Sequence, residues 1–356
     1  MGGPCQQGRL RPYIAAMTDP APDSPILVEA TRGDMVESRH RGFVAVVDAD
    51  GNRVAAWGDP ERLIYPRSAI KPLQALAVIE SGAAKRYALT DEEIALACAS
   101  HAGEADHVGR IAAWLARMGL AGADLECGAH PPADPAAAEE LIRTGAKPCP
   151  LHNNCSGKHA GMVATALHRG EPTRGYIAPD HPVQIRLKIL LAEMSGATLA
   201  DAPRGIDGCG IPVYGMPLEA LARAMARLAR PDDLPPERME AAWRVIAAMA
   251  AHPRLVSGAG RFDTEAMTIA CGRAVVKGGA EGVHVAALPA TGLGIAVKIE
   301  DGAGRAASAV MAALLIRFAD LAPAAETKLA RWREQPVLNV VGKNVGVVRA
   351  AASLDS

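Results

Sequence analysis

Apolar and polar residues alternate in short runs near both ends of the chain. Within 26–57, the runs ILVEATRG and FVAVVDADGNRVAAW have this pattern, and residues 50–52 (Asp-Gly-Asn) have the chemistry of a hairpin turn. Within about 274–299, the runs AVVKGG, VHVAAL and GIAVKIEDG are rich in β-branched residues and separated by glycines. The pattern predicts a β-hairpin region at each end.

Helical periodicity dominates the remainder of the chain. Each hairpin region is followed by an apolar helical segment, at 71–83 and at 305–322. Between about 90 and 255, six further segments have the spacing of amphipathic helices. They are DEEIALACAS, HVGRIAAWLARMG, SGKHAGMVATALHRG, PVQIRLKILLAEMSG, LEALARAMARLAR and MEAAWRVIAAMAAH.

Strands at both ends and helices in the middle predict an α/β (α+β) fold with one antiparallel sheet built from both termini. We expect one two-lobed domain over 25–356, with a sheet lobe from about 25–85 and 260–350 and an inserted helical lobe at about 86–259. Residues 1–24, which are rich in Pro, Gly and Gln, are expected to be a disordered extension.

Composition narrows the possible partners. Lys and Arg number 38 against 39 Asp and Glu, and aromatic residues make up only 3% of the 356 residues. Nucleic-acid binding needs a basic surface and benefits from aromatic rings on which bases stack, so we expect no nucleic-acid partner.

The sequence also argues against a membrane partner. The apolar segment 306–325 is interrupted by Arg317 and Asp320, and the first residues contain no apolar stretch typical of a signal peptide. Seven cysteines, an odd number spread along the chain, are a poor disulfide framework and suit a reducing compartment. We therefore expect a cytoplasmic protein.

The segment PRSAIKP at 66–72 places a serine and a lysine three positions apart. On a helix, Ser68 and Lys71 would share one face, and Pro72 is best tolerated in a first turn. A neutral lysine amine could take the serine proton and activate the oxygen as a nucleophile. Ser68 as a helix cap with Lys71 on the surface is the simpler alternative. The motif follows a hairpin and opens an apolar helix, as in penicillin-recognising enzymes, which favours catalysis.

Two further segments follow the order in which β-lactamase-type folds supply their site. CASHAGE contributes Ser100 and His101 after a helical run, although a helix end with capping side chains is an alternative. In VVKGGAEG, Lys277 ends a strand and runs into glycines, which resembles the Lys-Thr-Gly strand of serine β-lactamases with Gly in place of Thr. The order of the three motifs indicates one composite site.

Two loops rich in Gly and Asn, HNNCSGKHAGM and GIDGCGIP, carry the densest set of chemical groups. Two cysteines with a nitrogen donor could ligate a soft metal. Two buried thiols that pack the loops together are the alternative, since the spacing is not that of a zinc finger. The polar and thiol side chains of interest are Asn154, Cys155, Lys158, His159, Asp207 and Cys209.

Taken together, RSAIKPLQALAVIESGAA, CASHAGE, HNNCSGKHAGM, GIDGCGIP, RFDTEAM and KGGAEGV resemble the rhizobial class of bacterial L-asparaginase II, the inducible and thermolabile type. The resemblance covers about residues 25–322. It implies a fold like that of serine β-lactamases and serine glutaminases, and a homodimer. The loop VSGAGRF at 256–262 departs from the family stretch in its small residues, which could alter substrate fit.

The resemblance assigns catalytic roles residue by residue. The family's Ser-x-x-Lys falls on Ser68 and Lys71, its second serine on Ser100, and the lysine paired with that serine on Lys277. Lys71 would take the proton of Ser68, and the other two residues would support the proton transfers.

The resemblance also implies a zinc site. The family's zinc ligands, two cysteines and an unusual lysine, fall on Cys155, Lys158 and Cys209, with Asp207 beside them. Our candidate substrate-binding residues are Arg67, His101, Asn154, His159 and Asp207, and Arg67 and His101 are the alternatives for holding the substrate carboxylate.

The predicted reaction is hydrolysis of the side-chain amide of L-asparagine to L-aspartate and ammonia through an acyl-enzyme on Ser68. A serine glutaminase or a β-lactam-type hydrolase is the alternative enzyme, although a cytoplasmic chain would not meet peptidoglycan precursors. The alternative without catalysis is a zinc-dependent binding protein that keeps a degenerate hydrolase site.

Overall fold

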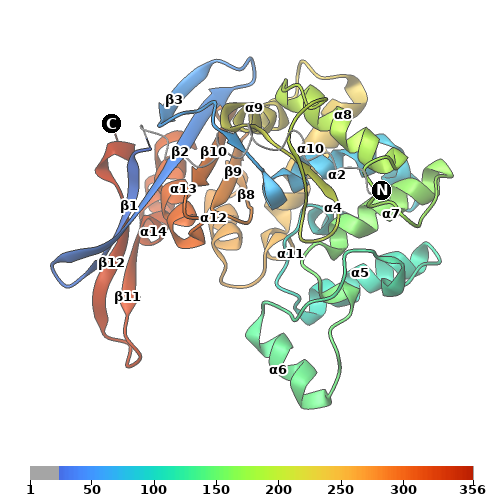
Figure 1. Ribbon diagram of the computed structural model, residues 1–356, viewed down its shortest axis with the longest axis horizontal. Coiled ribbons are helices and arrows are strands. Elements are labelled where there is room, and N and C mark those ends of the chain that lie inside the picture. The colour runs from blue at the N-terminus through green and yellow to red at the C-terminus, as the bar shows by residue number, and fades with distance from the viewer. Residues whose placement is uncertain (1–23, 356) are drawn as a thin grey trace, which may run out of the picture.

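The computed structural model describes residues 24–355. The disordered extension predicted for 1–24 lies outside these residues, apart from Ser24. Figure 1 shows a sheet with covering helices on one side of the molecule and a group of helices on the other. No helix in the described part of the chain is long and apolar enough to cross a membrane.

Residues 24–355 contain an eight-stranded antiparallel sheet in the order β11-β12-β1-β2-β10-β9-β8, with β3 paired to β2. In this order, β1 and β2 from the start of the chain lie between strands from its end, which confirms a sheet built from both termini. The strands are β1 (Ile26–Arg32), β2 (Met35–Asp48), β3 (Arg53–Trp57), β8 (Val275–Gly278), β9 (Val283–Leu288), β10 (Leu293–Ile299), β11 (Glu334–Leu338) and β12 (Asn344–Ala350).

Helices cover both faces of the central strands. Consecutive residues of β9 are all buried, and consecutive side chains of a strand point to opposite faces. The helices α9 (Leu218–Ala229) and α13 (Gly304–Phe318) both pack on β9 and β10. At Gly294, a Cβ atom would lie 2.0 Å from the Ala222 carbonyl oxygen, so only glycine lets α9 approach β10 this closely.

The helical lobe confirms the predicted inserted helices. The helix α2 packs at its centre against α7, α8 and α10, although residues 25–85 were predicted for the sheet lobe. The helix α4 packs against α7 and α10. The segment LEALARAMARLAR, predicted for this lobe, forms α9 and packs on the sheet as well. The helices of the lobe are α2 (Lys71–Glu80), α4 (Asp91–Ala97), α5 (Ala105–Arg117), α7 (Ser156–Arg169), α8 (Pro182–Ser195) and α10 (Pro236–Ala251).

Two predicted helices are shorter than expected. The helix predicted for 71–83 ends at Glu80, because Gly82 adopts φ +85° and turns the chain before the next helix. The helix predicted for 305–322 ends at Phe318, and Asp320 beyond it has φ +49°.

Other elements were not predicted from the sequence pattern. They are the strands β11 and β12 described above, the short strands β4 (Leu63–Ile64), β5 (Arg204–Ile206), β6 (Pro212–Tyr214) and β7 (Met216–Pro217), and the helices η1 (Arg67–Ile70), α3 (Ala83–Arg86), η2 (Gly122–Asp124), α6 (Pro135–Thr144), η3 (Pro150–His152), α11 (Pro253–Val256), α12 (Phe262–Ala270), α14 (Pro323–Arg333) and η4 (Ala352–Leu354).

Candidate active site

The Ser68 turn lies where the sheet meets the helical lobe. Ser68 lies in the 3₁₀ turn η1, and Lys71 is the first residue of α2. Arg67 has φ +51°. Residues other than Gly adopt this left-handed backbone conformation only at an energetic cost, and such residues are common at functional sites. The Ser68 side chain caps neither helix, and Lys71 is fully buried. The alternative of a capping serine with a surface lysine is therefore wrong.

Lys71 connects three segments of the site through its amine. Its Nζ donates to the Ala99 carbonyl oxygen at 2.6 Å, to Ser100 Oγ at 2.8 Å and to the Asn154 carbonyl oxygen at 3.5 Å. Burial lowers the pKa of Lys71, although the Cys155 thiolate opposes this shift. The Lys71 backbone N–H donates to the Ser68 carbonyl oxygen, whereas no hydrogen bond within the described residues joins Lys71 Nζ to Ser68 Oγ.

The end of strand β8 brings a second lysine to the Ser68 turn. At Gly279, a Cβ atom would lie 3.1 Å from the Pro66 carbonyl oxygen and 3.2 Å from the Ala69 nitrogen, so the two backbones are in close contact. Lys277 is buried, and burial together with the nearby positive charge of Lys71 lowers its pKa to about 7. The structure thus brings the early Ser-x-x-Lys motif and the late Lys-Gly strand together.

Ser100 is paired differently from the expectation that the resemblance gave. Its hydroxyl accepts a hydrogen bond from Lys71, whereas Lys277 Nζ donates to the Gly278 carbonyl oxygen at 2.5 Å. The pairing of Ser100 with Lys277 is not formed among the hydrogen bonds of the described residues.

A buried hydrogen-bonded pair that the sequence analysis missed, Asp263 and His284, supports the end of β8. Asp263 Oδ1 lies 2.8 Å from His284 Nε2, and Asp263 Oδ2 accepts from the Gly278 N–H at 2.9 Å. Burial opposes ionisation of Asp263, but His284 and Lys277 together hold the pKa of its carboxyl well below the usual range. Asp263 therefore places a negative charge behind Lys277, and its place in the motif RFDTEAM was the available signal.

Two candidate substrate-binding histidines are buried, and both ring nitrogens of His101 have hydrogen-bond partners, whereas His159 Nε2 has none among the described residues. The Gly103 N–H donates to His101 Nδ1 at 3.1 Å, so the ring proton lies on Nε2, which is 2.8 Å from Ser156 Oγ. His159 Nδ1 is 2.8 Å from the Tyr176 hydroxyl. Burial lowers the pKa of both imidazoles well below the usual range, so both rings are neutral at pH 7.

The other three candidate substrate residues connect the two loops to the segment that carries Ser68 and Lys71. Arg67 Nε donates to Asp207 Oδ1 at 2.7 Å, which ties the turn to the loop between β5 and β6. Burial opposes ionisation of Asp207, but Lys158 and Arg67 lower its pKa. Asn154 accepts from Lys71 Nζ through its carbonyl oxygen, and its Oδ1 lies 3.1 Å from Cys155 Sγ.

The predicted metal ligands converge in the structure. Lys158 Nζ lies 3.0 Å from Cys209 Sγ, and the Cys209 thiol hydrogen-bonds to Cys155. This bond and the positive charge of Lys158 hold the pKa of Cys155 well below its usual range, despite burial.

A soft divalent cation fits this donor set. Lys158 carries a proton in this structure, because the charge of the two cysteine sulfurs raises its pKa despite burial, and an ammonium has no free lone pair. Once that proton is lost, its amine and the two cysteine sulfurs would match the sulfur and nitrogen preference of zinc. Within residues 24–355, no three His, Cys, Asp or Glu side chains come together as a metal site, so the third protein ligand would be Lys158. Asp207 Oδ2 lies 3.8 Å from Cys209 Sγ and would stand beside the ion.

The family model described as L-asparaginase II matches residues 28–350. No curated protein sequence matches the chain. Among solved structures, a β-lactamase from Mycobacterium bovis has 15% identity and a TM-score of 0.38, covering 82% of this chain and 94% of that chain. A D-alanine carboxypeptidase, AmpC, from Burkholderia cenocepacia has 13% identity and a TM-score of 0.34, covering 82% and 92%. These structural overlaps are too loose to support a statement about chemistry.

Proposed function

The chain belongs to the L-asparaginase II family and is an amidohydrolase that acts on L-asparagine, and from this premise we propose that Ser68 is its nucleophile. The match to the family over residues 28–350 carries this proposal, because that range includes every candidate catalytic residue. The strained backbone before Ser68 and the buried lysine after it support the assignment.

The proposed reaction is an acyl transfer in two steps. Lys71, as the neutral amine, takes the Ser68 proton while the serine oxygen forms a bond to the amide carbon of the side chain. The bond from that carbon to nitrogen then breaks, and the nitrogen leaves as ammonia with a proton from the lysine side. Water adds to the aspartyl ester, releases L-aspartate and restores the Ser68 hydroxyl.

Ser100 and Lys277 move protons in this scheme. The bond between Lys71 Nζ and Ser100 Oγ, at 2.8 Å, gives the base a route for the proton that it has taken. Lys277, with its pKa of about 7, supplies a second amine that is partly neutral near pH 7. Backbone N–H groups at the Ser68 turn are the proposed donors to the oxyanion.

We propose that Cys155, Lys158 and Cys209 hold zinc beside this site. The ion would supply a fixed positive charge and a link between the two loops that contribute its ligands. Asp207 connects that position to the Ser68 turn through Arg67, so a bound ion would hold the turn in place.

We propose a homodimer in a reducing cytoplasm, which fits the free thiols of the six cysteines within the described residues.

Ammonia release from L-asparagine, compared with L-glutamine and a chromogenic β-lactam, tests the activity. Turnover of asparagine well above the other two is expected. Preference for glutamine would indicate a serine glutaminase, and cleavage of the β-lactam a β-lactam-type hydrolase. Zinc binding without any turnover would indicate a binding protein with a degenerate site.

A further inference from the structure

Three arginines lie around the Ser68 and Ser100 segments, and they differ in their partners. Arg67 pairs with Asp207 at 2.7 Å, and Arg254 pairs with Glu104 at 2.6 Å. Arg261 differs, since no carboxylate of residues 24–355 lies within 4.0 Å of its guanidinium.

Arg261 instead donates to backbone oxygens at the site. Its Nη1 lies 3.1 Å from the Ser100 carbonyl oxygen and 3.2 Å from the Ser257 carbonyl oxygen. The side chain is exposed, so its other N–H groups are accessible. Its positive charge also acts on His101 and Lys277, where it adds to the effect of burial in lowering both pKa values. The guanidinium therefore lies beside Ser100 and within electrostatic range of Lys277.

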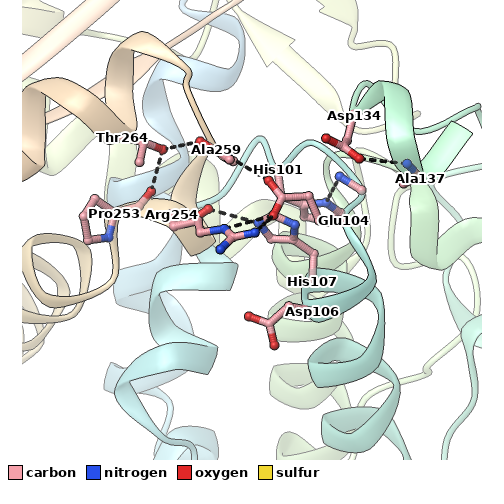
Figure 2. Close-up of polar contacts among 12 residues, drawn as sticks. His101, Glu104, Asp106, His107, Asp134, Ala137, Pro253, Arg254, Ala259 and Thr264 are labelled. Carbon is pink, nitrogen blue, oxygen red and sulfur yellow. Dashed lines mark hydrogen bonds and ion pairs between the residues drawn. The ribbon is translucent and has the colours of Figure 1, made fainter.

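The loop before Arg261 is fixed by hydrogen bonds to the buried carboxylate of Glu104, which Figure 2 shows. Glu104 Oε2 accepts from Arg254 Nη2 at 2.6 Å, and Oε1 accepts from the Ala259 N–H at 2.7 Å. Thr264 Oγ1 donates to the Gly258 carbonyl oxygen at 2.6 Å from the other side. These bonds hold the loop at both ends, so Arg261 is positioned before a ligand binds.

The loop also packs directly on the segment that carries Ser100. The Ser100 N–H donates to the Val256 carbonyl oxygen at 2.9 Å. At Gly258, where φ is +126°, a Cβ atom would lie 2.6 Å from the Ala102 Cβ, so the close contact requires glycine. The position of Arg261 is thus coupled to the position of Ser100.

We propose that Arg261 binds the α-carboxylate of the substrate and so determines specificity for a free amino acid, an inference that rests on the proposed function. A guanidinium matches a carboxylate in geometry and can donate two parallel hydrogen bonds. The other candidates are less suited, because Arg67 is already paired with Asp207, and His101 is neutral with both ring nitrogens occupied.

The test varies the enzyme and the substrate together. Arg261→Met and Arg261→Lys are compared with wild type on L-asparagine and on L-asparaginamide, whose α-carboxylate is replaced by a neutral amide. Ammonia release must be assigned to the side-chain amide by identifying the product. On asparagine, Arg261→Met should lower kcat/KM about 100-fold, mainly through KM, and Arg261→Lys should recover part of the loss. On asparaginamide, both variants should stay within about threefold of wild type.

Arg143→Met is the matched control, because that guanidinium pairs with Glu140 on the exposed helix α6 and should leave both substrates unaffected. Equal losses on both substrates would mean that Arg261 only holds the Ser100 segment, and no loss on asparagine would mean no role; either result overturns the inference. A wild-type enzyme that releases no ammonia from asparagine would overturn the proposed function as well.

Discussion

Two buried lysines set the chemistry of the site at the scale of single residues. Lys71 and Lys277 are almost completely inaccessible to solvent, and burial lowers the pKa of each amine. Lysine is rarely buried in this way unless it is paired, and the shift opposes folding at neutral pH. Two such groups beside a strained serine turn are typical of functional sites and support the proposed catalytic roles.

Replacing Ser68 tests the nucleophile. Ser68→Ala should reduce asparagine hydrolysis to below a few per cent of wild type, because no ester can then form. The side chain is half-buried and caps no helix, so thermal unfolding should be unchanged. Steady-state ammonia release and a circular dichroism melt measure the two effects. Turnover that survives in Ser68→Ala and disappears in Ser100→Ala would assign the nucleophile to Ser100.

The pKa of Lys277 predicts how activity depends on pH. Burial lowers this pKa to about 7, so the amine is mostly protonated below that pH and mostly neutral above it. If the neutral lysine pair is needed, kcat/KM should rise with pH from neutrality, with one apparent pKa between about 7 and about 9.5 that belongs to the coupled pair. A pH–rate profile with the zinc content checked at each pH measures this.

The variant Lys277→Met sharpens the same test. Removing one positive charge should raise the apparent pKa of the remaining lysine, because protonation of that amine is no longer opposed. The whole profile should then move to higher pH. A profile that is flat from about pH 6 to about pH 10, or that only falls on the alkaline side, would contradict a neutral lysine base.

At the scale of elements, the proposed metal ligands come from the start of α7 and from the turn between β5 and β6. A Cβ atom at Gly157 would lie 2.2 Å from the Leu96 carbonyl oxygen, so α7 and α4 are in backbone contact beside these residues. Cys155 directly precedes α7 and Ser100 follows α4, so a bound metal would affect the geometry around Ser100.

Zinc content tests the two metal-binding loops. Purified protein should contain about one zinc per chain, and Cys155→Ser or Cys209→Ser should lower that content. Loss of the ion should also raise KM, because Asp207 beside Cys209 holds Arg67 at the Ser68 turn. Elemental analysis with steady-state kinetics measures both effects. The matched control is Cys271→Ser, because Cys271 is exposed and far in sequence from the proposed ligands. Wild-type protein that contains no metal and has an unchanged KM would contradict the proposed zinc site.

Element prediction succeeded where the hydrophobic pattern was strong. The hairpin regions and the long helices of the lobe were found because their buried positions recur at the expected spacing. The helix α14 was missed because Leu329 is its only buried residue, so almost no apolar periodicity exists in PAAETKLARWR. The first half of β2 was missed because its run MVESRHR is largely polar, although it pairs along β1.

The sequence predicted which local motifs would meet. The segments that carry Ser68, Lys71 and Lys277 were recognised because each motif has a local spacing and context, and the structure brings these segments together. The actual partner of Ser100, and the supporting pairs Asp263–His284 and Glu104–Arg254, join segments far apart in the chain. No spacing rule predicts such contacts, because they depend on how the sheet and the helical lobe pack.

At the scale of the whole molecule, the strand order places the proposed catalytic residues at one edge of the sheet, away from the packing at the other edge. The strands β11 and β12 lie at one edge of the sheet, and β8, which carries Lys277, ends it at the other. The C-terminal turn η4 follows β12 and packs on α13, where Leu354 is fully buried. The last residues of the chain thus close the core at the edge that is distant from the site.

This arrangement predicts that a core defect at the C-terminal edge lowers stability without changing the chemistry. Leu354→Ala should reduce the free energy of unfolding by about 2–5 kcal/mol, because it removes buried apolar surface and leaves a cavity against α13. Denaturant unfolding measures this loss, and kcat/KM at 25 °C should remain within about twofold of wild type, because effects at distant sites are usually independent. Val341→Ala, at the exposed end of the β11–β12 hairpin, is the control and should change neither quantity. A large fall in kcat/KM for Leu354→Ala under native conditions would show that the two edges of the sheet are coupled and that the separation is wrong.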